Sequence, residues 1–273
     1  MKRRALLLAI AVLVFLFPLT WTALASLGIV PDNSSRPPSW AGSLSLEHFA
    51  DVGLAEPAFW DELTTSTVAA LTATFITIVV SYPAAYALAR SRSRLESFVS
   101  PAFVVLASLP AMSYVIPLSD LMRRAHLLDT LAGIVLSEAA VTAPLAVYVL
   151  HGACRQLSAE WEEAAVIDGA GLLRTLGQVV LPMVAPAVVA TAIVVFVIDW
   201  NLLLVPLVLT SGEVKTVPVA MSDFFTFERE LEWPAAAAAL VISLAPVAVL
   251  VALFHRALQR FALEAVGPES SDE

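Results

Sequence analysis

Six long apolar windows constrain the fold of this chain more than any other feature of its sequence. They cover residues 5–27, 66–89, 99–118, 130–150, 184–209 and 235–254. Four of them contain no Asp, Glu, Lys or Arg, whereas Glu138 lies in the fourth and Asp199 in the fifth. At roughly 20 residues, each can cross a hydrocarbon core as a helix that satisfies its own backbone hydrogen bonds. The sequence therefore predicts an all-α integral membrane protein with six transmembrane helices.

The composition agrees with this fold class. Of the 273 residues, 59% are hydrophobic and 14% are charged, and the mean hydropathy is +0.84. A soluble domain carries about 25% charged residues. No polar stretch is long and regular enough to build a core of its own. We therefore expect a single transmembrane domain over residues 1–273, with its core over residues 66–260.

Lys and Arg are unequally divided between the two sets of connecting segments. Ten lie on one side: Lys2, Arg3, Arg4, Arg90, Arg92, Arg94, Arg155, Arg174, Arg256 and Arg260. Five lie on the other: Arg36, Arg123, Arg124, Lys215 and Arg229. Basic residues favour the cytoplasmic side of a membrane. The count therefore predicts a multi-pass protein with both termini in the cytoplasm, although Arg123 and Arg124 go against the rule.

The first window has an alternative interpretation. Lys2-Arg3-Arg4, the apolar run and Ala23-Leu24-Ala25 together are similar to a cleavable signal peptide. The apolar stretch is longer than the usual hydrophobic region of such a peptide and continues to Val30. This length favours an uncleaved first membrane helix.

A polar segment, residues 158–182, interrupts the apolar pattern on the basic side of the chain. We call it the 158–182 hairpin. Glu160, Glu162 and Glu163 place negative charge where a helix start favours it. Gly169 and a second glycine two residues later are expected to end this helix, because glycine reaches positive φ at little cost. A second short helix and Pro182 then return the chain to the membrane. The pattern predicts an exposed docking element with no catalytic groups.

The sequence of this hairpin resembles the EAA loop of ATP-binding-cassette (ABC) importer permeases. Residues 162–170, Glu-Glu-Ala-Ala-Val-Ile-Asp-Gly-Ala, are similar to the motif of the smaller, MalG-like permease of carbohydrate importers. Further similarities follow in the family's order over residues 18–207: Pro18, Trp21 and Ser26, then 85–90, 116–118, 127–130, 200–201 and 206–207. The hydropathy pattern extends the resemblance to about residue 260.

This resemblance implies a transport subunit of the bacterial inner (plasma) membrane. Its partners would be a second, MalF-like permease, two ATPase subunits, an extracytoplasmic solute-binding protein and membrane lipid. By position, the residues that dock the ATPase would be Glu162, Glu163, Ala164, Ala165, Asp168 and Gly169. The lysines, Lys2 and Lys215, lie in no GxxxxGK[ST] loop. The chain is therefore expected to bind no cofactor and to be no enzyme itself, with ATP and Mg held by the ATPase subunits.

Two carboxylates within the apolar windows are candidates for a solute path. Counting from the outer boundary at the helical rise, Glu138 lies about 12 Å deep and Asp199 about 15 Å deep. Charged groups in lipid are costly and often mark substrate paths. Trp200, Asn201 and Tyr114 could complete a polar and stacking surface for a sugar. The alternative is a structural role for both carboxylates, in contacts with backbone or with the partner permease.

Two other functions remain open at this point. The same architecture could import glycerol phosphate or another polyol, although no Lys or Arg lies in the six windows to bind a phosphate. A more distant alternative is an ion-coupled secondary transporter with Glu138 and Asp199 as a proton relay. The formal charge of −9 argues against nucleic acid as a partner.

Overall fold

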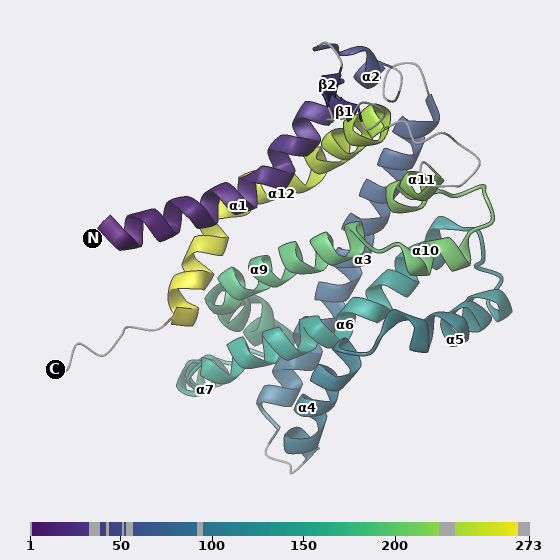
Figure 1. Ribbon diagram of the computed structural model, residues 1–273. Helices are drawn as coiled ribbons and strands as arrows, with labels where there is room; N and C mark the ends of the chain where they lie inside the picture. Colours follow the sequence, from purple (N-terminus) through teal and green to yellow (C-terminus); the bar gives the residue numbers. More distant parts are fainter. Residues whose placement is uncertain are drawn as a thin grey trace. The chain divides into compact units, whose positions relative to one another are not determined.

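The computed structural model describes residues 2–32, 39–41, 44–50, 52, 57–91, 95–223 and 233–266. Helices make up most of them (Figure 1). The elements in chain order are α1 (Lys2–Ser26), β1 (Val30–Asp32), β2 (Ser39–Ala41), α2 (Glu47–Phe49), α3 (Pro57–Ala89), α4 (Leu95–Ala107), α5 (Ala111–Arg124), α6 (Leu131–Gln156), α7 (Glu160–Ile167), α8 (Leu172–Thr175), the π-helical turn η2 (Leu176–Val180), α9 (Leu181–Trp200), α10 (Leu204–Leu209), α11 (Val217–Asp223) and α12 (Trp233–Val266). They fall into two compact units, described separately below.

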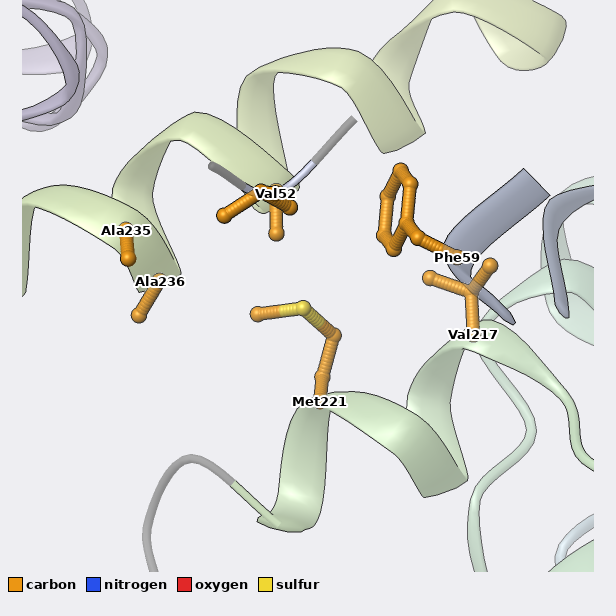
Figure 2. Close-up of a cluster of buried hydrophobic side chains, with 7 residues drawn as sticks. Val52, Phe59, Val217, Met221, Ala235 and Ala236 are labelled. Atoms are coloured by element: carbon orange, nitrogen blue, oxygen red, sulfur yellow. The ribbon is translucent and has the colours of Figure 1, made fainter. Parts of the chain in front are cut away.

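The first unit comprises Met1–Thr64 and Lys215–Ala248. Its strands β1 and β2 pair antiparallel, with Val30 opposite Ala41, and so add a small ribbon to the all-α fold that the sequence predicts. A hydrophobic cluster joins the start of α3, α11 and the start of α12 (Figure 2). Its buried members are Val52, Phe59, Val217, Met221, Ala235, Ala236 and Ala239. Small alanines on α12 leave room for the larger Phe59 and Met221 side chains in this cluster.

The second unit comprises Thr65–Val214 and Val249–Glu273 and is organised around α6. Ala69 and Ala73 of α3 pack with Ala139 of α6, and such small residues let two helices approach closely in lipid. Polar groups join the same two helices: Thr77 Oγ1 lies 3.2 Å from Thr142 Oγ1. On another side, buried Cys154 of α6 packs with Val180 of η2 and Val184 of α9. Helix α6 is therefore enclosed by other helices for most of its length.

Four helices are long and apolar enough to span a membrane, or five if one bent pair counts as a single span, among the residues that the structure describes. The four are Ala58–Ala89, Leu131–Gln156, Leu172–Trp200 and Trp233–Phe254. They confirm spans at the second, fourth, fifth and sixth apolar windows. The first window is helical in α1, but its described apolar part, Val12–Ser26, is shorter than 18 residues. The prediction of six spans is thus confirmed only as four to five.

The third window, residues 99–118, is not one continuous helix. Helices α4 and α5 meet there at an angle of 92°. The break falls at Ser108–Pro110, and Pro110 is the N-cap of α5. Proline has no N–H to continue the helix and forces the preceding residue out of helical geometry. The window is therefore a bent pair rather than a straight helix.

The fifth window, residues 184–209, differs from its prediction at both ends. Its helix already begins at Leu172, so the second helix of the 158–182 hairpin continues through η2 into α9 without a break. At the other end, α9 stops at Trp200, because Asn201 Nδ2 donates a 2.7 Å hydrogen bond to the Val197 carbonyl oxygen and competes with the backbone ladder. The remaining apolar residues form the separate helix α10.

Gly133 in the first turn of α6 is required by close packing. A Cβ at this position would lie 2.1 Å from the Leu127 carbonyl oxygen, in the turn between α5 and α6. The same turn is held by Thr130, whose Oγ1 accepts a hydrogen bond from the Gly133 N–H at 3.0 Å. No side chain fits between this turn and the helix start.

We expect Gly133→Ala to destabilise the protein by about 1–3 kcal/mol, the usual cost of overpacking. The matched control is Gly152→Ala, also in α6, where an added Cβ meets nothing within 4 Å. That control should be neutral or slightly stabilising, because alanine favours helix. Melting temperatures of the detergent-solubilised protein measure both effects. Equal melting temperatures for the two variants would contradict the packing argument.

Candidate functional site

The 158–182 hairpin begins with helix α7 and ends it with a glycine stop. Gly169 has φ of +82°, as the sequence predicts. Its N–H donates to the Val166 carbonyl oxygen at 3.0 Å, and the Ala170 N–H donates to the Ala165 carbonyl oxygen at 2.9 Å. This pair of bonds is a Schellman motif, which satisfies the last carbonyl groups of a helix and turns the chain. The turn places α7 against α8 and η2.

The outward face of the hairpin is apolar. Its exposed large side chains are Trp161, Val166, Ile167, Leu172 and Leu173. Ile167 is 86% exposed and Leu173 is 85% exposed. Single exposed apolar residues are common, but five on one short hairpin are an enrichment typical of surfaces that bind another protein.

A groove of about 570 Å³ lies between this hairpin and the end of α3. Glu163, Val166, Ile167, Leu172 and Thr175 line its hairpin side. Its opposite side is formed by Tyr86 and Arg90. The groove thus has apolar walls with acidic and basic groups at its edge.

Glu162 points inward from α7 and is bound by the end of α3. Arg90 Nε donates to Glu162 Oε1 at 2.8 Å and to Oε2 at 3.0 Å. The Tyr86 hydroxyl donates to Glu162 Oε2 at 2.8 Å. Arg90 Nη2 also donates to the Leu157 carbonyl oxygen at 3.2 Å, where α6 has just ended. Only 12% of the Glu162 side chain is exposed.

These contacts hold the Glu162 carboxyl in its charged form. Burial alone would raise the pKa of Glu162, but the hydrogen bonds from Arg90 and Tyr86 outweigh it and lower that pKa below its ordinary value. The same hydrogen bond raises the pKa of the Arg90 guanidinium. The two groups therefore form a charged pair across the physiological range.

A second contact joins α3 to the other arm of the hairpin. The Tyr82 hydroxyl donates to the Leu176 carbonyl oxygen at 2.9 Å. Leu176 starts the π-helical turn η2, and its carbonyl also accepts the Leu181 N–H. Sequence reasoning missed Tyr82, Tyr86 and Arg90 as site residues. Their signal was the spacing of four residues, which places all three on one face of a helix.

The structure divides the six residues that were predicted to dock an ATPase. Glu163, Ala164, Asp168 and Gly169 are exposed, and Ala165 is half-buried. Glu162 is separated from them because its carboxylate is already bound within the chain. The sequence could not distinguish Glu162 from Glu163, since both are acids in the same helical turn.

The structure buries both carboxylates that were predicted to line a solute path. Glu138 is 2% exposed and Asp199 is 3% exposed. Within the described residues, Glu138 Oε2 and both Asp199 carboxylate oxygens make no hydrogen bond. The Thr74 and Thr142 hydroxyls lie beside Asp199. These groups form a polar core between α3, α6 and α9 rather than a surface of the chain.

The other three candidates for the path lie apart from this polar core. Trp200 is buried and stacks on Phe196, with ring centroids 5.9 Å apart. Asn201 is exposed and caps α9. Tyr114 packs, half-buried, in the cluster that joins α5 to α10. The structure therefore does not bring the five residues together as one binding surface, and their contact with solute stays a prediction.

Most of this chain matches the model of one protein family. Residues 78–263 match the family model described as binding-protein-dependent transport system inner membrane component. The match covers more than half of the chain and includes the whole hairpin. The chain belongs to this family.

Individual family members resemble the chain over most of its length. The trehalose transport system permease protein SugB of Mycobacterium tuberculosis is 36% identical over 68% of this chain and 69% of its own. The trehalose/maltose transport system permease protein MalG of Thermococcus litoralis is 32% identical over 92% of this chain and 90% of its own. The family resemblance stated from the sequence is thus confirmed.

A solved structure shares the fold. It is the crystal structure of a bacterial ABC transporter involved in the import of the acidic polysaccharide alginate, with a TM-score of 0.76 and 21% sequence identity. The match covers 93% of this chain and 95% of that chain. At this identity, the likeness supports the permease fold and not the solute.

The stabilisation by the Glu162–Arg90 ion pair is expected to depend on pH. Because the pKa of Glu162 lies below its ordinary value of 4.5, the pair stabilises the folded hairpin fully above that pH and less as the pH falls below it. We expect Glu162→Gln to lower the melting temperature by a constant amount between about pH 7 and 5.5, and by less below about pH 4.5. Glu213→Gln, on an exposed loop, is the control. A constant difference at all these pH values would contradict the charged pair.

The burial of Glu138 and Asp199 favours the structural alternative and can be tested with neutral isosteres. We expect Glu138→Gln and Asp199→Asn to assemble and to retain solute uptake within about threefold, because the volume of each side chain and its capacity to accept hydrogen bonds are kept. Glu138→Ala and Asp199→Ala should lower stability by leaving cavities. Loss of uptake in fully assembled Gln and Asn variants would instead place the two carboxylates on the solute path.

Proposed function

We propose that this chain is a permease subunit of an ABC importer for a carbohydrate. Together with a second permease it forms the membrane path for a solute that an extracytoplasmic binding protein delivers. Separate ATPase subunits drive the cycle. The observation that carries this proposal is the 158–182 hairpin, a rigid element with an exposed apolar face at the junction of two long apolar helices.

The shape of the hairpin suits the docking of an ATPase. Glu163 and Asp168 provide acidic groups on an exposed helix, and Ala164 provides a small surface that fits a narrow cleft. The Schellman stop at Gly169 fixes where this helix ends. We therefore propose Glu163, Ala164, Ala165, Asp168 and Gly169 as the docking residues. ATP and Mg are bound by the partner subunits, and this chain contributes no residue to them.

A carbohydrate is the solute class that the relatives support. Beside the two trehalose permeases, the similar proteins include the diacetylchitobiose uptake system permease protein DasC of Streptomyces coelicolor and the sulfoquinovosyl glycerol transport system permease protein SmoH of Agrobacterium fabrum. These names describe neutral and anionic glycosides. The absence of Lys and Arg from the apolar windows favours a neutral sugar over glycerol phosphate for this chain.

The secondary-transporter alternative loses its support in the fold. A proton relay needs carboxylates that reach water on alternate sides, but Glu138 and Asp199 are enclosed by the helices of their own chain. We propose a multi-pass arrangement in the inner membrane, with both termini and the hairpin in the cytoplasm, as the Lys and Arg count predicts.

Two substitutions test the docking residues. Glu163→Ala removes an exposed charge, and Gly169→Ala forces a side chain into positive φ at a cost of about 1–2 kcal/mol. In the complete importer we expect each to lower solute-stimulated ATPase activity about tenfold or more, as for a residue at the centre of an interface. The matched control is Glu213→Ala, an equal charge change on an exposed loop away from the hairpin. Unchanged stimulation in both hairpin variants would show that the hairpin does not dock the ATPase.

A further inference from the structure

We infer that Tyr82 and Tyr86 of α3, with Arg90 directly after its end, act as a strut that couples the 158–182 hairpin to the membrane helices. This inference rests on the proposed function, in which the hairpin docks an ATPase. The three side chains are positioning residues, because they touch neither solute nor ATP. We call them the α3 strut.

The connectivity of the chain makes a non-covalent link to α3 necessary. The hairpin is joined by the backbone to α6 through residues 157–159 and to α9 through η2. Helix α3 ends at Ala89, some 70 residues before the hairpin in sequence, and has no such connection. If α7 moves when an ATPase pulls on it, α6 and α9 must follow, whereas α3 follows only through side-chain contacts.

The α3 strut contacts both arms of the hairpin. Arg90 and Tyr86 bind Glu162 on α7, and Tyr82 binds the Leu176 carbonyl oxygen at the start of η2. Arg90 also binds the Leu157 carbonyl oxygen just before the hairpin. At the rise of a helix, positions four residues apart are separated by about 6 Å, so the strut extends over about 12 Å of α3.

The strength of these contacts suits the transmission of force. Arg90 donates to both oxygens of one carboxylate, and such charge-assisted contacts are shorter and stronger than neutral ones. The Arg90 guanidinium also lies over the Tyr86 ring, with Cζ 5.9 Å from the centroid, which limits its movement. The contacts are largely screened from water, since 23% of the Arg90 side chain and 12% of the Glu162 side chain are exposed.

The strut reaches the core of the second unit through α3. In the helix turns that precede Tyr82, Thr77 and Ser81 contact α6, with Ser81 Oγ 3.4 Å from the Ala143 carbonyl oxygen. Ala85, between the two tyrosines, is fully buried against Val147 and Leu150 of α6. A displacement of the hairpin is therefore passed to a helix that already packs rigidly against α6.

The test compares variants of the complete importer, reconstituted with its second permease, ATPase subunits and binding protein. Arg90→Gln should keep the ATPase subunits bound but lower the ratio of solute-stimulated to basal ATPase activity, and solute uptake, by about tenfold or more, as expected for a charged hydrogen bond. Tyr82→Phe, which removes one neutral hydrogen bond, should lower the same ratio about fivefold. Arg90→Lys should retain part of the coupling, because it keeps the charge but loses the two-pronged contact.

Controls of the same chemistry lie elsewhere in the second unit. Arg124→Gln removes an exposed arginine of α5, and Tyr148→Phe removes a hydroxyl from α6. Both should leave stimulation unchanged. In a double-mutant cycle, Arg90→Gln and Glu162→Gln should be non-additive because they break the same contact, whereas Arg90→Gln and Tyr82→Phe should be nearly additive.

The outcomes separate this inference from the proposed function. Normal coupling in Arg90→Gln and Tyr82→Phe, together with uncoupling by Glu163→Ala, would overturn the strut and leave the docking hairpin intact. Loss of the ATPase subunits from Arg90→Gln complexes would also overturn it, because the side chains would then shape the docking face rather than transmit its movement. If Glu163→Ala couples normally, the proposed function of the hairpin itself fails.

Discussion

The packing of α6 against α3 and α9 is the constraint on which the second unit depends. Small residues on α3 let the two helices approach, and the hydroxyls of Thr77 and Thr142 meet between them. This contact encloses Glu138 and Asp199, because the same three helices surround them. It also sets the position of the hairpin, since α6 leads into α7 and the end of α3 carries Arg90 to Glu162. A change in this packing would reach both polar sites at once.

The sequence predicted well those features that a single residue or a single stretch determines. Apolar length was sufficient for α3, α6, α9 and α12, because lipid leaves the backbone no alternative to a helix. Gly169 was sufficient for the hairpin turn, because only glycine adopts positive φ there without cost. The depth predicted for Glu138 and Asp199 stays a prediction, and depth alone could not reveal that the chain buries both carboxylates in a core.

The sequence did not predict features for which several similar residues lie close together and only one of them has the effect. Pro101, Pro110 and Pro117 all lie near the third window, yet only at Pro110 does the chain turn through 92°. Pro182 was expected to return the chain to the membrane at the start of the fifth span, but the helix of that span already begins at Leu172 and continues through Pro182. Likewise, adjacent Glu162 and Glu163 could be told apart only after Arg90 was placed beside one of them.

The buried and the exposed side chains of the hairpin are constrained by different molecules. Glu162 must fit an arginine and a tyrosine encoded in the same gene, so a change there requires a compensating change in this chain alone. Ile167 of α7 and Leu173 of α8 are instead largely exposed, and their shape is free to follow that of a separate polypeptide. The two sets of side chains can therefore diverge independently during evolution. An importer could therefore adapt to a related ATPase subunit through substitutions of exposed hairpin residues. The contacts of Glu162 with Arg90 and Tyr86 would stay unchanged.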